Sequence, residues 1–105
     1  MMIAKVTGSL VATQKVETMI GHKLMLVEPC RLDPATRGSL VGSGRVLVAV
    51  DTVGAGEGEM VLVTQGSSAR LTPETKTLPV DTVIIGILDT VHVAQVCVYN
   101  KEQKS

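Results

Sequence analysis

Glycine stands at every second position of one short loop, residues 54–58 (Gly-Ala-Gly-Glu-Gly), between two valine-rich segments. Glycine adopts backbone conformations that are closed to other residues and lets a neighbouring chain approach closely. The second apolar segment runs directly into another glycine, Gly66, followed by Ser-Ser-Ala-Arg. Because this stretch contains no recognisable catalytic group, we interpret it as a determinant of shape between two strands.

Valine accounts for seventeen of the 105 residues, and Tyr99 is the only aromatic residue. Branching at Cβ suits the pleated surface of a sheet, so this composition favours strands over helices. The length suits one domain, and a domain of this size buries only about 60–70% of the surface of its unfolded chain. Association with further copies would bury more apolar surface.

The hydrophobic pattern predicts an all-β chain with five main strands and one short helical turn. The strands are expected over residues 2–13, 22–28, 45–52, 59–65 and 81–89, with a last short strand over 91–99. Gly8 is predicted to form a bulge that helps the sheet to curl into a barrel. Pro29 is expected to end the second strand, before a long exposed loop over residues 30–44. We expect one domain over residues 1–99 and a polar tail over 100–105.

The strand expected over residues 81–89 is apolar on both of its faces. Alternation would let Val83, Ile85 and Ile87 fill a barrel, which leaves Ile84 and Leu88 on the reverse face. Apolar side chains on an outer face need cover, either from a local loop or helix or from another subunit. We favour the subunit, because so short a chain leaves little else to cover them.

Charge and targeting signals exclude several classes of protein. Ten basic and ten acidic residues cancel, which argues against a nucleic-acid partner because phosphate recognition needs a basic face. The sequence has no run of 18 apolar residues that could span a membrane, and it opens without the pattern of a secretory signal. Cys30 and Cys97 are far apart and form no CxxC motif, so we expect reduced thiols in a cytoplasmic protein.

The candidate chemical groups do not combine into a site. His22 and His92 are isolated histidines without partners at metal-ligand spacing. Ser67 and Ser68 lack the G-x-S-x-G elbow of a nucleophile, so a serine that caps the helical turn over residues 66–71 is the favoured interpretation. The loop over residues 54–58 departs from G-x-G-x-x-G, and its glutamates would repel phosphate. We therefore expect no catalytic residue, cofactor or metal.

Six segments of the sequence together resemble one protein family. They are residues 4–8, 11–15, 21–27, 50–59, 66–70 and 79–87. In order and at compatible spacing, they resemble the bacterial microcompartment vertex proteins, the EutN/CcmL family, over roughly residues 1 to 91. The resemblance implies a small five-stranded barrel, similar to the OB fold, that forms cyclic pentamers. It also implies a structural role, in which pentamers cap the corners of cytoplasmic polyhedral shells beside hexameric shell proteins.

The resemblance also suggests where copies of the chain would meet. The residues expected at the subunit interface or the axial opening are Gly54, Gly56, Gly58, Glu59, Gly66, Ser67, Ser68, Arg70, Ile84 and Leu88. Two other classes of function stay open. An OB-like barrel could bind single-stranded nucleic acid, although it would lack aromatic stacking platforms and a basic groove. An enzyme that uses Cys30 or His22 is the weaker alternative, because no base–nucleophile pair is visible.

Overall fold

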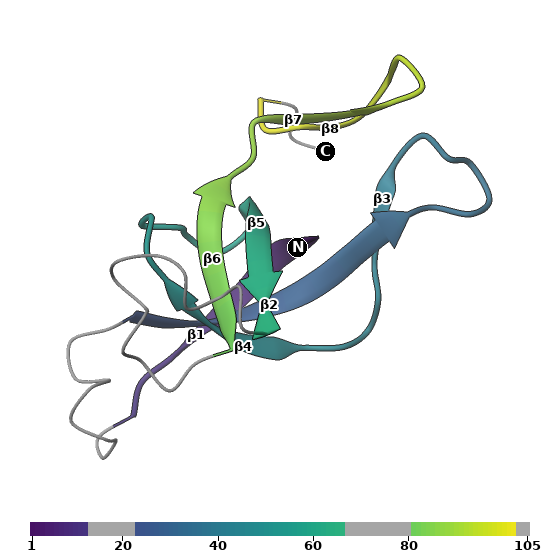
Figure 1. Cartoon of the computed structure of the whole chain (residues 1–105). Helices are drawn as coiled ribbons and strands as arrows, with labels where there is room; N and C mark the ends of the chain where they lie inside the picture. Colours follow the sequence, from purple (N-terminus) through teal and green to yellow (C-terminus); the bar gives the residue numbers. More distant parts are fainter. Residues whose placement is uncertain (13–22, 67–80, 103–105) are drawn as a thin grey trace.

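The computed structural model describes residues 1–12, 23–66 and 81–102. Five strands close into a barrel in the order β1-β5-β6-β4-β2, because β1 pairs with both β5 and β2 (Figure 1). A short strand, β3, extends the sheet beyond β2, and a separate hairpin follows the barrel. The elements are β1 (Met2–Leu10), β2 (Lys23–Leu32), β3 (Leu40–Gly42), β4 (Leu47–Asp51), β5 (Met60–Gln65), β6 (Thr82–Ile87), β7 (Thr90–Val93) and β8 (Val96–Asn100). The expected all-β barrel is confirmed.

The interior of the barrel is filled by small and medium-sized apolar side chains from every strand of the barrel. The buried cluster consists of Ala4, Val6, Met25, Val27, Ala49, Ala55, Val61, Val63 and Ile84. An eight-stranded barrel already leaves just enough room for side chains to fill its interior, so five strands enclose still less space. This narrow interior explains a valine-rich and alanine-containing core without large aromatic rings.

Gly8 lies at a bulge in β1, as the sequence predicts. The pairing of β1 with β2 shifts between Val6, which faces Val27, and Gly8, which faces Leu26, so that Thr7 is the extra residue. A bulge increases the local twist and bends the strand. The bend lets β1 reach β5 with its first half while it pairs with β2 along most of its length.

A second bulge, in β6, makes the predicted faces wrong for residues 83–85, whereas Ile87 lies against the core as predicted. Leu62 of β5 pairs with Gly86 and Val63 pairs with Ile84, so Ile85 is the extra residue. Ile84 therefore lies in the barrel core at 0% exposure, and Ile87 packs against the same core three positions later. Val83, expected inside, lies instead in a smaller cluster with Val50, against which Leu24 and Ile85 pack.

β2 does not end at Pro29, contrary to expectation, but continues to Leu32. Pro29 lies between the part of β2 that pairs with β4, up to Val27, and the part that pairs with β3, from Cys30 onward. Its carbonyl oxygen accepts a hydrogen bond from the backbone N of Ser43 at 2.9 Å. The missing N–H of proline interrupts neither ladder there, which is where a strand tolerates this residue.

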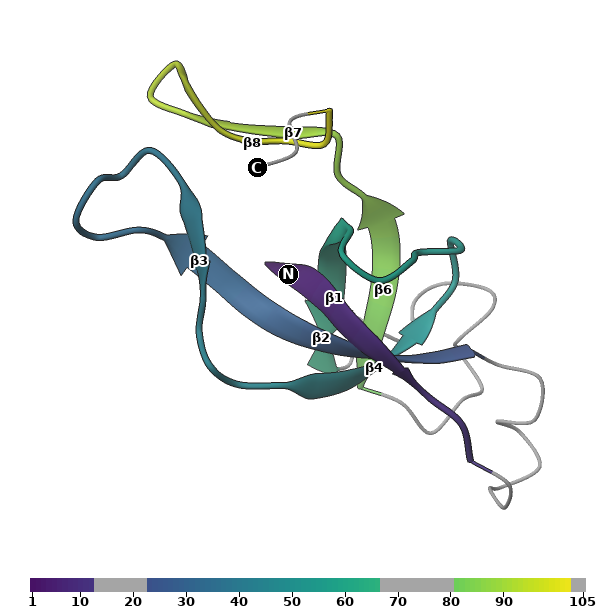
Figure 2. The ribbon, with the colours of Figure 1, turned by 180° about the vertical axis from the view of Figure 1, so that it is seen from behind.

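The single strand expected over residues 91–99 is in fact the hairpin formed by β7 and β8. Its two turn residues, Ala94 and Gln95, have φ of 50° and 68°. Positive φ at both positions is typical of a type I′ turn, which usually carries Asn-Gly. Because Ala-Gln is not a turn signal, no local pattern predicted a division of the strand here. Figures 1 and 2 both show this hairpin beyond one end of the barrel.

The expected helical turn and the expected C-terminal tail both involve residues that the structure does not describe. The helical turn expected over residues 66–71 lies outside them except for Gly66. The division into a domain over residues 1–99 and a tail stays a prediction, and β8 itself ends at Asn100. Within the described part of the chain, no helix is long and apolar enough to cross a membrane.

Candidate functional site

The glycine-rich loop that follows β4 is fastened to β1 of its own chain. The backbone N of Gly58 donates to the carbonyl O of Val6 at 2.8 Å, and the backbone N of Val6 donates to the carbonyl O of Glu59 at 2.9 Å. Within the loop, the backbone N of Gly56 donates to Oε1 of Glu59 at 2.6 Å. These bonds give the loop one defined conformation before any second copy binds.

Ala55 anchors the same loop in the barrel core, where its exposed fraction is 0%. Its carbonyl O accepts a hydrogen bond from Nζ of Lys23 at 3.0 Å, and the same Nζ lies 3.6 Å from Oδ2 of Asp51. The other carboxylate oxygen, Oδ1, accepts hydrogen bonds from the backbone N of Val53 and of Gly54. The loop over residues 54–58, named the lid loop below, is therefore held on the barrel by the buried methyl group of Ala55 and by the Lys23–Asp51 pair.

The backbone angle requires glycine at three positions of this region but not at Gly56. Gly54, Gly58 and Gly66 have φ of 79°, 88° and 70°, the left-handed region that other residues rarely adopt. Gly56 does not have positive φ, but a Cβ there would lie 3.4 Å from Oε1 of Glu59. No described atom lies within 4 Å of a Cβ built on Gly54, Gly58 or Gly66. At these three positions the backbone angle, and not crowding by described atoms, requires glycine.

Glu59 connects the loop to the end of the hairpin. Its Oε2 lies 3.1 Å from Nζ of Lys101, and the backbone N of Lys101 donates to the carbonyl O of Asp89 at 2.8 Å. The hydrogen bond from the backbone of Gly56, followed by that from Lys101, lowers the pKa of Glu59. The same ion pair raises the pKa of Lys101. The two ends of the hairpin thus meet beside the glycine-rich loop.

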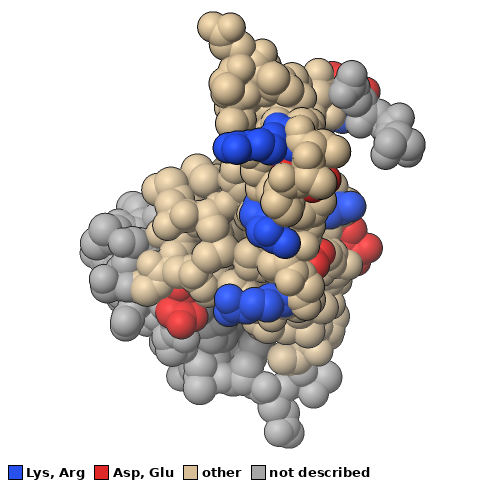
Figure 3. Space-filling model, turned by 90° about the vertical axis from the view of Figure 1, so that its right-hand side faces the viewer, with Lys and Arg blue, Asp and Glu red and all other residues tan. Residues whose placement is uncertain are grey.

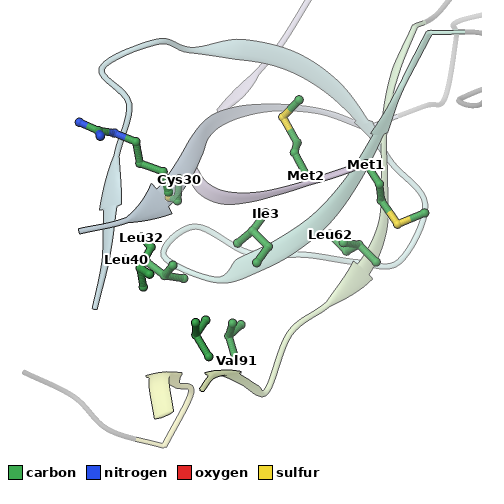
Figure 4. Close-up of a pocket in the computed structure, with 10 residues that line it drawn as sticks. Met1, Met2, Ile3, Cys30, Leu32, Leu40, Leu62 and Val91 are labelled. Carbon is green, nitrogen blue, oxygen red and sulfur yellow. The ribbon is translucent and has the colours of Figure 1, made fainter. Parts of the chain in front are cut away.

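An open apolar groove of about 550 Å³ lies between the barrel and the hairpin (Figure 4). It is lined by Met1, Met2, Ile3, Cys30, Arg31, Leu32, Leu40, Leu62, Val91 and Val93. Burial, followed by the nearby Glu28 carboxylate, raises the pKa of the Cys30 thiol, which keeps the thiol protonated. With eight apolar side chains, one thiol and one arginine, the groove has the composition of a contact surface and not of a reaction centre.

No catalytic or metal-binding arrangement emerges from the described residues. Among them, no group of three or more His, Cys, Asp or Glu side chains could hold a metal ion. His92 and Cys97 are exposed on the hairpin, and His22 lies outside the described residues. Figure 3 shows basic side chains in separate spots on one face, with uncharged surface and acidic groups between them. This surface is not the continuous basic groove that single-stranded nucleic acid requires.

The structure brings together only part of the predicted contact set. Gly54, Gly56, Gly58 and Glu59 share the loop described above, whereas Ser67, Ser68 and Arg70 lie outside the described residues. Ile84 has no exposed surface with which to touch a neighbour, so its expected place on an outer face is wrong. Leu88 is half-buried just after β6, and its backbone N donates to the carbonyl O of Met60 at 2.8 Å.

The groove itself was not foreseen from the sequence. Its walls come from four strands of the six-stranded sheet and from the hairpin, so no contiguous motif represents it. One signal was available in the sequence. Val91 and Val93 alternate with polar residues after the last predicted barrel strand, where the barrel core cannot account for apolar side chains.

Comparison with known proteins gives a consistent result at the level of sequence. Residues 1–89 match the family described as ethanolamine utilisation protein EutN/carboxysome. The chain is 45% identical over 101 residues to the carboxysome shell vertex protein CcmL of Synechocystis sp., covering 96% of this chain and 95% of the relative. It is 43% identical over 90 residues to the bacterial microcompartment shell vertex protein PduN of Salmonella typhimurium, covering 86% and 97%.

Solved structures agree with these relatives. Gloeobacter violaceus CcmL superposes with a TM-score of 0.83 at 40% identity, over 98% of this chain and 100% of that chain. The pentameric microcompartment shell protein GrpN from Rhodospirillum rubrum superposes with a TM-score of 0.75 at 39% identity, over 90% of this chain and 100% of that chain.

Proposed function

Since the chain belongs to the EutN/CcmL family, we propose that it is a structural shell protein whose pentamers close the vertices of a bacterial microcompartment. The observation that carries this proposal is similarity along nearly the whole chain to proteins named for that position in the shell. The barrel, the lid loop and the hairpin all lie within the superposition on Gloeobacter violaceus CcmL, which covers 98% of this chain.

The mechanism of such a protein is geometric. A flat layer of six-fold tiles cannot close into a polyhedron, because a closed surface needs five-fold points to supply curvature. A ring forms when one patch on each copy meets a different patch on the next copy until the rotation closes. We therefore propose the chain itself and the hexameric proteins of the shell facets as partners, with the pentamer seated in a shell inside the cytoplasm.

We further propose that the protein has no catalytic activity. The described surface supports this, because its thiol in the groove is held protonated and its exposed histidine has no partner in a metal cluster. The exposed parts of the lid loop, together with Gly66, Ser67, Ser68, Arg70 and Leu88, are the proposed contacts with a neighbour or with the axial opening. Open space beside Gly54, Gly58 and Gly66 supports this placement.

The test has two parts, in vitro and in cells. Native mass spectrometry of the purified chain without added ligand should find five copies per particle, and a stable monomer at micromolar concentration would contradict the proposal. Cells that lack the protein should still make facet protein and cargo, yet form elongated or leaky shells by electron microscopy. Normal closed polyhedra in cells without this chain or a paralogue would overturn the assignment to vertices.

A further inference from the structure

The β7–β8 hairpin leaves apolar side chains exposed, although Val98 on β8 is buried at 7% exposure. It forms a two-stranded sheet of its own, and among the described strands β7 and β8 pair only with each other. An isolated two-stranded hairpin is marginally stable at best in water. The facing pair at its tip, Val93 and Val96, is 38% and 47% exposed. Such a hairpin above an open apolar groove requires a further surface to pack against.

A second exposed apolar patch lies on the outer face of β4 and the residue before it. Val46 and Val48 are 55% and 50% exposed. Leu47 and Ala49, the residues that follow each of them, point to the core. Because side chains alternate along an extended chain, the two valines project from the same side. The described residues do not bury these two valines, so the packing of the described part of the chain does not account for their apolar character.

The order of the strands separates these two patches. Around the closed barrel, β1 and β5 are neighbours, and β4 lies two strands away from β5 through β6 and two strands away from β1 through β2. The barrel wall of the groove comes from β1 and β5, where Ile3 and Leu62 pair, and from the part of β2 that pairs with β3. Val46 and Val48 are not among the residues that line it, so they do not fill the groove of their own chain.

We propose that the groove between the hairpin and the barrel receives the outer face of β4 from the next copy of the chain, with Val46 and Val48 against Leu62, Val91 and Val93. This inference rests on the proposed pentamer and names the two surfaces that build it. Two different patches of one molecule form a heterologous contact, which is the type that generates a ring. The contact also supplies the apolar cover that the hairpin lacks.

The first test places a charge in each patch separately. Val48→Lys and Val93→Lys alter exposed side chains, so each chain should still fold, with a circular dichroism spectrum like that of the wild type. Each variant should run as a monomer in native mass spectrometry under conditions in which the wild type is a pentamer. Val11→Lys is the matched control, because Val11 is 93% exposed and belongs to neither patch; this variant should stay pentameric.

The outcomes separate the two proposals. A monomeric wild type would overturn the proposed function itself. A pentameric wild type with pentameric Val48→Lys and Val93→Lys variants would overturn this inference and leave the proposed function standing. Loss of the pentamer in the Val11→Lys control as well would also overturn it, because the effect would then not be specific to the two patches.

A cross-linking experiment tests the pairing of the patches directly. In a background of Cys30→Ser and Cys97→Ser, two single-cysteine variants, Val48→Cys and Val93→Cys, are treated with a short bismaleimide. The dimer on a denaturing gel should form in the mixture after subunit exchange and not in either variant alone. Cross-linking within the Val48→Cys sample or within the Val93→Cys sample would show like patches meeting and would overturn the inference, as would the absence of a product in a mixture shown to be pentameric.

Discussion

The barrel and the hairpin of this protein are stabilised by different kinds of contact. The barrel closes its hydrogen-bond ladders on themselves and buries side chains from all five strands. The hairpin has one ladder, a turn with two non-glycine residues at positive φ, and an ion pair at its base. The family match ends at residue 89, directly before the hairpin begins at Thr90. We therefore expect the barrel to be stable within one chain and the hairpin to depend on the proposed neighbouring copy.

The largest expected effect follows from shortening a core side chain of the barrel. Ile84→Ala should lower the free energy of unfolding by about 2–5 kcal/mol, because it removes buried methyl groups and leaves a cavity. Val96→Ala on the exposed hairpin should cost less than about 0.5 kcal/mol in the isolated chain. Urea unfolding followed by circular dichroism, in the monomeric Val48→Lys background, measures both. Equal losses from the two substitutions would remove the distinction between the regions.

A smaller effect is expected within the lid loop and distinguishes the two roles of glycine. Gly58→Ala forces a side chain into a φ of 88° and should cost about 1–2 kcal/mol. Gly56→Ala keeps an ordinary φ and needs only a slight movement of the Glu59 carboxylate, so it should cost less. Thermal unfolding of the two variants and the wild type ranks their stabilities. A greater loss of stability in Gly56→Ala would show that crowding, and not the backbone angle, is the stronger reason for glycine in this loop.

The smallest effect concerns the ion pair that joins the lid loop to the hairpin. The pKa of Glu59 is lowered from its ordinary 4.5, so its contribution is present above about pH 4.5 and is lost as the pH falls through the lower, folded-state pKa. The pKa of Lys101 is raised from 10.5, so its contribution is present below about pH 10.5 and is lost as the pH rises through the higher, folded-state pKa. The ion pair therefore supports the hairpin between these limits.

Hydrogen exchange of the β8 amides measures this contribution. At pH 7, Glu59→Gln should exchange these amides faster than wild type by less than about fivefold, since both groups are partly exposed to solvent. As the pH falls below the folded-state pKa of Glu59, the difference should shrink, because the wild-type carboxylate is then largely protonated. A difference that does not change with pH would show that the charge of Glu59 does not carry the effect.

The amino-acid pattern alone was enough to predict the class of fold and much of its local geometry. Valine-rich alternation indicated strands, and Gly8 marked the bulge in β1, because both signals act within a few residues of the chain. Gly54, Gly58 and Gly66 were recognisable as conformational requirements, although Gly56 differs from them. The absence of aromatic and basic clusters also argued against a nucleic-acid partner without reference to any structure.

Which face of β6 points inward depends on how the strands pair and could not be read from the sequence pattern. The bulge at Ile85 arises where β6 pairs with β5 in the closed barrel, and it reverses the assignment of Ile84. Pro29 was compatible with a continuing strand only because two different partners, β4 and β3, meet at that point. The groove and the exposure of Val46 and Val48 could not be predicted from the sequence either, since strands distant in sequence become neighbours only when the barrel closes. The alternation of residues shows which side chains share one face of a strand. Pairing between strands determines whether that face points to the core or to the outside.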